Sequence, residues 1–133
     1  RPGGLALTVD LAPTLLEFAG VPVGPQIQGR SLVPLFGSAD APQGWRESVL
    51  VEFYTYETPF PHLLDMDYRA IRTVRYKYIH WIKYPAQDEL YDLERDSLEL
   101  RNLTGDPALA DVKADLKSEL GRLVLQAIGL PAR

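Results

Sequence analysis

The most regular pattern in the chain is a hydrophobic repeat toward its C-terminal end. Apolar residues recur there at three- and four-residue spacing: Leu109, Val112, Leu116, Leu120 and Leu123. This period places them on one face of a helix. Asp106 is a suitable N-cap, Pro107 fits the first helical position, and Gly129 with Pro131 marks the end. We therefore predict one long helix that packs through this face, with Gly121 as an interior weak point.

Four shorter stretches have the composition and alternation of β-strands. They are residues 47–54, 68–73, 76–82 and 89–93. The second and third are close enough in sequence to form an antiparallel hairpin around Val74 and Arg75. Because a β-branched residue is unfavourable at positive φ, we expect a turn other than type I′ there. The proline-containing stretch that precedes the hairpin is predicted to be a loop.

A second, shorter helix is predicted near the N-terminal end, over residues 8–19. Thr8 or Asp10 can cap or support it, and Gly20 ends it. Its apolar face consists of Leu11, Leu15 and Phe18. Residues 21–42 are rich in proline and glycine, which favours an irregular connector.

Together these elements predict an α+β fold. We expect an antiparallel sheet of about four strands with the long C-terminal helix packed on it. A short helix and an irregular loop precede this sheet and look as if they belong to the edge of another, α/β domain. The expected domain boundary therefore separates residues 1–45 from residues 46–133, which hold the sheet and the long helix.

Composition and charge narrow the possible functions. The chain has 133 residues, 46% of them hydrophobic, which is ordinary globular usage. It has no cysteine, so it has no disulfide, no thiolate nucleophile and no cysteine-based zinc site. No apolar run is long enough to span a membrane, and the opening RPGGLALT has neither an initiator methionine nor the layout of a signal peptide. We expect a piece of a longer protein.

The formal charge of −4 argues against nucleic-acid binding. Basic and aromatic residues do alternate along the predicted hairpin, as a single-strand binding surface would require. These residues are Arg69, Arg72, Arg75 and Lys77, with Tyr68, Tyr76, Tyr78 and Trp81. We favour a simpler interpretation, in which one face of the sheet is buried and the other is solvated.

Two blocks of sequence in a set order resemble a known family. The first consists of VDLAPTLL at 9–16, GVP at 20–22 and QGRSL at 28–32, and the second of YRAIRT at 68–73, RYKYI at 75–79 and ELYDL at 89–93, with Glu99, Asn102 and Leu103 beyond. Over residues 5–125 they are similar to the region that follows the catalytic core in sulfatases of the alkaline-phosphatase-like superfamily. Ser97 departs from the Asp-Pro that often follows the last string, which costs turn rigidity.

The resemblance implies chemistry that lies outside this chain. The family hydrolyses sulfate esters with a formylglycine made from the Cys or Ser of a C-x-P-S-R motif, beside a divalent metal, usually Ca²⁺. Neither C-x-P-S-R nor S-x-P-S-R occurs here. We therefore expect no catalytic and no metal-binding residue in the chain, no activity of the chain alone, and a missing N-terminal catalytic core as its partner. The face of Leu11, Leu15 and Phe18 would then be exposed or hidden by self-association.

One loop is a candidate for substrate contact. The resemblance implies that the C-terminal region lends loops to the rim of the active site, and residues 54–67 contain His62. A neutral imidazole can both donate to and accept from a sugar hydroxyl, so His62 is the candidate residue for binding a sulfated sugar. The simpler interpretation is an exposed loop histidine without such a role. A metal site of His62 with Asp65 and Asp67 is a weaker alternative.

Several other polar residues have structural interpretations. We expect His80 to be a packed, hydrogen-bonded residue of its strand, and Asp92 and Glu99 to brace turns. Arg30 is expected to pair with a carboxylate of the missing core.

Two further functions remain open. A related phosphonate or phosphate monoesterase would share this C-terminal region, because the region does not contain the nucleophile. An independent module that binds a carbohydrate or a protein is the third possibility.

Overall fold

The computed structural model describes residues 4–37, 39–55 and 61–129. The chain divides into two compact units, unit 1 (Arg1–Glu47) and unit 2 (Ser48–Arg133). Unit 1 contains the 3₁₀ turn η1 (Thr8–Asp10), helix α1 (Leu11–Phe18) and the turn η2 (Val33–Leu35). Unit 2 contains strands β1 (Ser48–Phe53), β2 (Tyr68–Thr73), β3 (Tyr76–Trp81) and β4 (Glu89–Asp92), the turns η3 (Pro61–Leu63), η4 (Pro85–Gln87) and η5 (Pro107–Leu109), and helix α2 (Ala110–Ala127).

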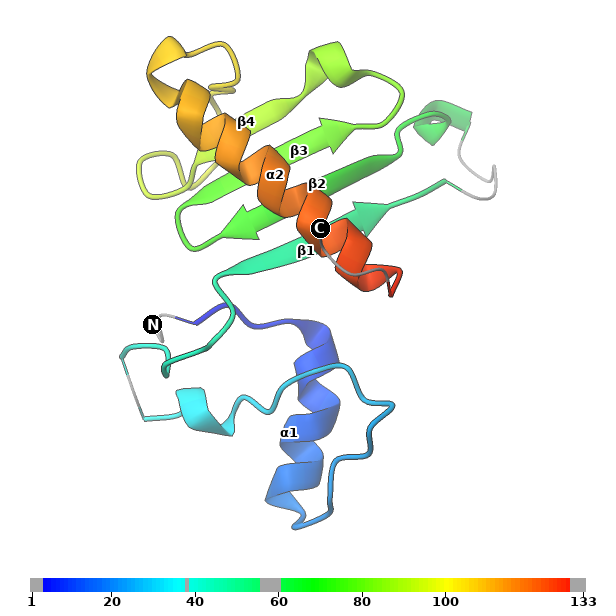
Figure 1. Ribbon diagram of the computed structural model, residues 1–133, viewed down its shortest axis with the longest axis vertical. Coiled ribbons are helices and arrows are strands. Elements are labelled where there is room, and N and C mark those ends of the chain that lie inside the picture. The colour runs from blue at the N-terminus through cyan, green and yellow to red at the C-terminus, as the bar shows by residue number, and fades with distance from the viewer. Residues whose placement is uncertain (1–3, 38, 56–60, 130–133) are drawn as a thin grey trace. The chain divides into compact units, whose positions relative to one another are not determined.

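The four strands of unit 2 form one antiparallel sheet in the order β1-β2-β3-β4 (Figure 1). The register aligns four apolar side chains in a row across it: Leu50, Ile71, Tyr78 and Leu90. Leu116 and Leu120 of α2 pack on this row. The predicted α+β fold, with the long helix on a four-stranded sheet, is confirmed.

The opposite face of the sheet has an aromatic row of its own. Phe53, Tyr68 and Trp81 are aligned by the register. Adjacent ring centroids in this row are 5.6 Å and 5.3 Å apart. Because side chains alternate between faces along a strand, Tyr68 and Tyr78 serve different faces. The alternation of aromatic and basic residues in the hairpin therefore follows from the two-sided sheet.

The hairpin turn and the edge of β4 are closed by side chains. Thr73 Oγ1 accepts the Tyr76 N–H at 2.8 Å, and neither Val74 nor Arg75 has a positive φ, as expected for this turn. At the edge of β4, Asn102 accepts the Leu90 N–H at 3.1 Å through Oδ1. Its side-chain amide donates to the Asp88 carbonyl at 3.0 Å. Asn102 thus satisfies backbone groups that an edge strand would otherwise expose.

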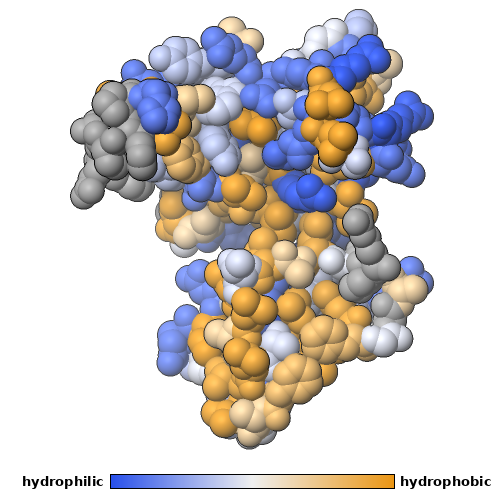
Figure 2. Space-filling view, turned by 180° about the vertical axis from the view of Figure 1, so that it is seen from behind, coloured by the Kyte–Doolittle hydropathy of each residue, from blue (hydrophilic) through white to orange (hydrophobic). Residues whose placement is uncertain are grey.

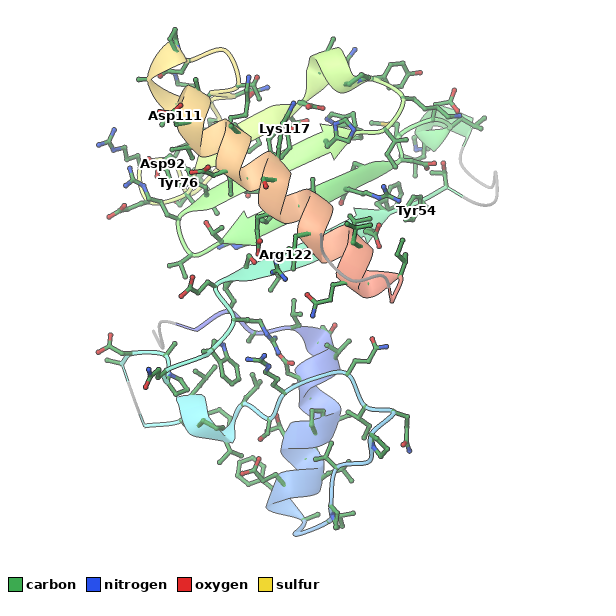
Figure 3. The ribbon with its side chains drawn as sticks, viewed as in Figure 1. Tyr54, Tyr76, Asp92, Asp111, Lys117 and Arg122 are labelled. Atoms are coloured by element: carbon green, nitrogen blue, oxygen red, sulfur yellow. The ribbon has the colours of Figure 1, made fainter. Side chains whose placement is uncertain are left out.

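Carboxylates brace the turns that follow the hairpin. Asp92 accepts from Arg75 Nη2 at 2.8 Å, and Tyr76 and Asp92 lie together at this end of the sheet (Figure 3). The guanidinium of Arg75 holds the pKa of Asp92 below its ordinary value. Glu99, which has a positive φ of 56°, accepts from Lys77 Nζ at 2.6 Å. Both carboxylates have the structural role predicted for them.

The predicted start of the long helix forms the 3₁₀ turn η5, and α2 itself begins three residues later, at Ala110. Asp106 accepts the Ala108 N–H at 3.0 Å, Pro107 opens the preceding 3₁₀ turn, and Gly129 follows the helix with φ 75°. No helix in the described ranges is long and apolar enough to cross a membrane.

Unit 1 is organised around Asp10, which is fully buried. Its carboxylate accepts the backbone N–H groups of Leu7 at 2.7 Å and Arg30 at 2.9 Å, and it pairs with both terminal nitrogens of Arg46. These bonds outweigh the effect of burial and lower the pKa of Asp10. Asp10 stands at the N-cap position of α1 without making a side-chain cap bond, so it supports the unit and does not cap the helix.

The contacts around Asp10 explain the glycine of the QGRSL string. A Cβ on Gly29 would lie 2.1 Å from the carbonyl oxygen of Val9, so only glycine fits there. The side chain of Arg30 donates to the Gly44 carbonyl at 3.0 Å. In the part of unit 1 that the structure describes, the side chain that forms an ion pair with a carboxylate is that of Arg46, which pairs with Asp10. The expected pairing of Arg30 with another domain stays a prediction.

Much of the apolar side-chain area of unit 1 is exposed. Leu11, Leu15 and Phe18 are 55%, 67% and 66% exposed, as the predicted shared face requires. The ring of Phe18 stacks on that of Phe36 at 6.0 Å, and Phe36 is itself exposed. Hydrophobic side chains accordingly gather on the surface of unit 1 in the view of Figure 2.

Gly121 lies inside α2 although neither its backbone nor its surroundings require glycine. A Cβ added there would meet no atom within 4 Å. We expect Gly121→Ala to stabilise the chain by about 0.5–1 kcal/mol, because it reduces the backbone entropy lost on folding. Urea denaturation measures the change. Gly129→Ala is the matched control and should destabilise, because its φ is positive. Equal losses for both variants would contradict this account of Gly121.

Candidate functional site

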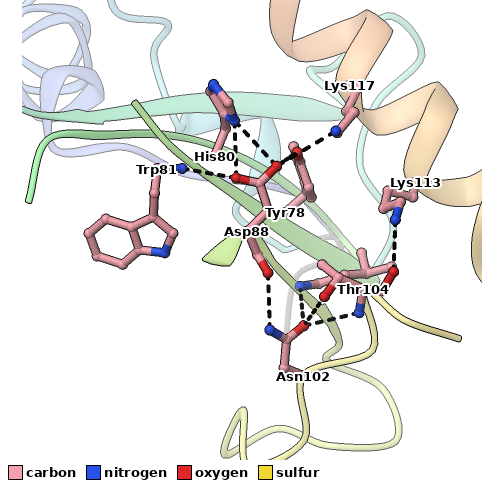
Figure 4. A network of polar contacts seen from close by, with 9 residues as sticks. Tyr78, His80, Trp81, Asp88, Asn102, Thr104, Lys113 and Lys117 are labelled. Carbon is pink, nitrogen blue, oxygen red and sulfur yellow. Dashed lines mark hydrogen bonds and ion pairs between the residues drawn. The ribbon is translucent and has the colours of Figure 1, made fainter. Parts of the chain in front are cut away.

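A polar cluster of unit 2 centres on Asp88, just before β4. Asp88 is 8% exposed, and its carboxylate accepts a hydrogen bond from the Tyr78 hydroxyl (Figure 4). It also accepts the Trp81 N–H at 3.2 Å and contacts His80 Nδ1 at 3.1 Å. Lys117 Nζ of α2 lies 3.6 Å from the same carboxylate. Asp88 therefore ties the sheet to the helix through a charge that is largely satisfied.

Tyr78 is the residue of the apolar row that has a polar side-chain atom, its hydroxyl oxygen. The side chain has no exposed area, and burial together with the hydrogen bond and charge of Asp88 raises the pKa of its hydroxyl. Tyr78 is thus a neutral donor and not a proton acceptor. His80 Nδ1 faces a carboxylate that can only accept, so Nδ1–H is the donor of this contact. The predicted hydrogen-bonded role of His80 is confirmed.

A groove of about 470 Å³ lies between α2 and the sheet, next to this cluster. Helix α2 supplies one wall, and β2 and β3 supply the other. Its lining residues are Arg69, Tyr78, His80, Lys117, Leu120, Gly121, Val124 and Leu125. The groove therefore combines an apolar wall with three basic side chains.

Arg69 joins the groove to the end of β1. Its Nε donates to Glu52 at 3.0 Å and to the Tyr54 hydroxyl at 2.8 Å, and Figure 3 shows Tyr54 near the end of that strand. The Tyr54 hydroxyl in turn donates to Glu52 at 2.7 Å. The hydrogen bond to Tyr54, with a smaller effect of the bond to Glu52, raises the pKa of Arg69 above its ordinary value. Arg69 therefore keeps its charge at all physiological pH.

The predicted substrate loop is described only in part. Residues 56–60 lie outside the described ranges. Asp67 holds the start of the loop, because Oδ1 accepts both the N–H and the hydroxyl of Thr55 at 2.7 Å. Asp65 has φ 70° and forms an ion pair with Lys83. His62 is exposed at η3, so it is accessible, and its role in substrate binding stays a prediction.

The weaker sequence interpretations lose support in this arrangement. Among the described residues, no three His, Asp or Glu side chains gather in a way that could hold a metal ion, so His62, Asp65 and Asp67 do not form such a site. Arg69, Arg75 and Lys77 are paired with carboxylates. Tyr78 is buried and cannot stack on a base. The contacts of the described residues therefore favour neither the metal-site nor the single-strand binding interpretation.

Comparison with known proteins decides the family. Residues 3–126 match the family of the N-sulphoglucosamine sulphohydrolase C-terminal domain. The chain belongs to this sulfatase family. The resemblance inferred from the two sequence blocks is confirmed, and the four-stranded sheet with α2 is the fold of the sulfatase C-terminal domain.

Relatives of this sulfatase domain are several times longer than the chain. N-acetylglucosamine-6-O-sulfatase of Bacteroides thetaiotaomicron is 35% identical over 113 residues, which are 84% of this chain and 20% of that protein. The solved structure of a protein bound to its substrate, D-glucosamine-2-N,6-O-disulfate, is also similar, with a TM-score of 0.73 and 34% sequence identity. The match covers 88% of this chain and 23% of that one.

Phosphonate monoester hydrolase of Agrobacterium radiobacter is also similar. It has a TM-score of 0.66 and 28% identity, over 88% of this chain and 24% of that one. The chain thus spans about a fifth to a quarter of the length of these three proteins.

Sequence reasoning missed Asp88, the centre of the polar cluster of this sulfatase domain. It precedes a short strand and belongs to no recognisable motif. The available signal was the alternation of β3, which places Tyr78 and His80 on one face and so requires a polar partner for two ring groups. Lys117 was missed because helical spacing marks only the apolar face of α2.

The Asp88 cluster predicts a difference between two tyrosines. Tyr78→Phe removes a donor from a buried carboxylate and should lower the free energy of unfolding by about 1–3 kcal/mol. Tyr91→Phe is the matched control, because the Tyr91 hydroxyl donates to the partly exposed Glu89 and should cost less than about 1 kcal/mol. Urea denaturation at pH 7 measures both. Similar losses would show that Asp88 does not depend on Tyr78.

Proposed function

We propose that this sulfatase domain works as the C-terminal part of a sulfuric ester hydrolase, supporting its catalytic core. The observation that carries the proposal is the family match over residues 3–126 together with the shared sheet and helix. Relatives in which the equivalent region is about a fifth to a quarter of the protein support the same role. The partner of the chain is then the catalytic core of the same protein.

Unit 1 supplies the contact with that core in this proposal. Residues 1–45 would form the edge of its α/β domain, and residues 46–133 the C-terminal subdomain. The exposed face of Leu11, Leu15 and Phe18 supports this role, because contiguous apolar surface of this kind marks an interface. In the chain alone, the same face would favour self-association.

The chemistry belongs to the core of the parent enzyme. Cleaving a sulfate ester requires an activated nucleophile, cationic stabilisation of the transferring group and a proton donor. The chain has neither the C-x-P-S-R nor the S-x-P-S-R motif from which formylglycine is made, and its described residues gather no metal ligands. The formylglycine and the Ca²⁺ expected of the parent would therefore be held by the core.

Sulfated sugars are the proposed substrates. The relatives include an N-acetylglucosamine-6-O-sulfatase and a structure with bound D-glucosamine-2-N,6-O-disulfate. In this proposal, His62 contacts the sugar from the rim of the active site. The exposure of His62 and its place in a loop braced by Asp67 support such a contact.

A phosphonate or phosphate monoesterase is the second candidate. The similarity to a phosphonate monoester hydrolase favours it, and the C-terminal domain does not contain the nucleophile that would separate the two activities. An independent carbohydrate- or protein-binding module has less support, because it leaves the exposed face of α1 unexplained.

The proposed activity is tested on the full-length protein that contains this chain. We expect it to hydrolyse glucosamine sulfates faster than phenyl phosphonate monoesters, with no turnover by the 133 residues alone. Release of inorganic sulfate measures the first reaction, and release of the phenol from the phosphonate monoester measures the second. Faster phosphonate cleavage would support the second candidate. Turnover by the isolated chain, abolished by changing one of its own side chains, would refute the assignment of the chemistry to the core.

His62 is tested by separating binding from chemistry. In the full-length enzyme, His62→Ala should raise KM for a glucosamine sulfate about tenfold, the effect of losing roughly 1.4 kcal/mol of contact, and leave a small aryl sulfate unaffected. Leu64→Ala, at another exposed residue of the same loop, is the matched control and should change neither KM. An equal effect of His62→Ala on both substrates would remove the sugar contact from the proposal.

A further inference from the structure

The groove between α2 and the sheet has the composition of a ligand site. Its volume of about 470 Å³ lies within the range of roughly 300–1,000 Å³ of small-molecule pockets. Leu120, Val124 and Leu125 give it an apolar helical wall. All its lining residues lie in unit 2, and the loop residue His62 is not among them. The groove is therefore separate from the proposed sugar contact.

Gly121 keeps the groove open. It lies one helical turn after Lys117 and four residues before Leu125, on the side of α2 that lines the groove. A Cβ there would meet no atom within 4 Å, so no packing contact requires the glycine. Glycine in the middle of a helix costs about 0.5–1 kcal/mol relative to alanine. Because Gly121 has no side chain, it leaves open space in the groove that Arg69 and Lys117 also line.

The basic side chains of the groove retain hydrogen-bonding capacity. Among the described residues, Arg69 makes its hydrogen bonds through Nε alone, which leaves the N–H groups of both terminal nitrogens available. Lys117 Nζ is 3.6 Å from Asp88, longer than a hydrogen bond, and its side chain is half exposed. The carboxylates that balance these charges, Glu52 and Asp88, are not among the lining residues.

We propose that this groove binds a small organic anion whose apolar, flat body lies along Leu120, Gly121 and Val124 and whose acidic group meets Arg69 and Lys117. A sulfonate, sulfate or carboxylate has the required charge, since a guanidinium and an ammonium both donate to such oxygens. The proposal does not rest on the activity of the parent enzyme, because every residue it uses lies in unit 2.

The test uses naphthalene-2-sulfonate as the probe and the 133-residue chain as the protein. Equilibrium dialysis with fluorescence detection measures the dissociation constant and is valid whether or not the chain self-associates. Naphthalene-2-sulfonamide, which has the same body without the charge, should bind at least about tenfold more weakly, a difference of 1.4 kcal/mol. Lys117→Gln should weaken sulfonate binding about threefold or more and leave sulfonamide binding unchanged.

Filling the groove gives the decisive comparison. Gly121→Leu should weaken probe binding at least about tenfold while it preserves or raises the denaturation midpoint, because leucine is a better helix former. Ser118→Leu is the matched control: it adds the same side chain at an exposed position of α2 that does not line the groove. It should leave binding unchanged.

Leu15→Ser locates the probe independently, because it alters the exposed apolar face of unit 1. Binding that survives Gly121→Leu and is lost in Leu15→Ser would place the probe on that face and overturn the proposal. So would equal affinity for the sulfonate and the sulfonamide. If Gly121→Leu fails to fold, Lys117→Gln decides, since Lys117 is exposed and its variant retains the core.

Discussion

Unit 2 depends on the register that aligns Leu50, Ile71, Tyr78 and Leu90 beneath α2. A shift of one residue in any strand would turn its core side chains to the other face, so the apolar row is compatible with one pairing only. The same register aligns Phe53, Tyr68 and Trp81 on the opposite face. One constraint thus determines the helix-covered core, the aromatic row and the place of every polar residue along the strands.

The Asp88 cluster is a consequence of that row. Tyr78 is the one member with a polar atom, and its buried hydroxyl needs an acceptor. Asp88 supplies it, and the resulting buried charge is in turn balanced by the Trp81 N–H, His80 and Lys117. Lys117 belongs to α2, so this ion pair joins the helix to the sheet beside the apolar contacts of Leu116 and Leu120. Gly121 lines the groove one turn after Lys117, and a Cβ there would meet no atom within 4 Å.

Unit 1 uses a similar device in a region with little regular structure. The buried carboxylate of Asp10 collects backbone donors from two segments and the guanidinium of Arg46. Gly29 permits the close backbone approach that brings Arg30 to it. These contacts organise the irregular connector from within and leave the apolar face of α1 exposed. The buried contacts of Asp10 hold the segment together, and the exposed apolar face is available to pack against another domain, as we propose for a segment at a domain edge.

The sequence alone determined the elements, because periodicity and turn chemistry are local properties, and its two blocks of motifs carried the resemblance to the family. The spacing from Leu109 to Leu123, the Asp106 cap and the strand alternation were sufficient for the fold. The sequence left open whether Asp10 caps or supports the first helix, because its partners, Arg30 and Arg46, are distant in sequence. The same reason explains why Asp88 and the groove were not predicted. Strand register and helix packing bring Arg69, His80 and Lys117 together, and these residues are far apart in the sequence.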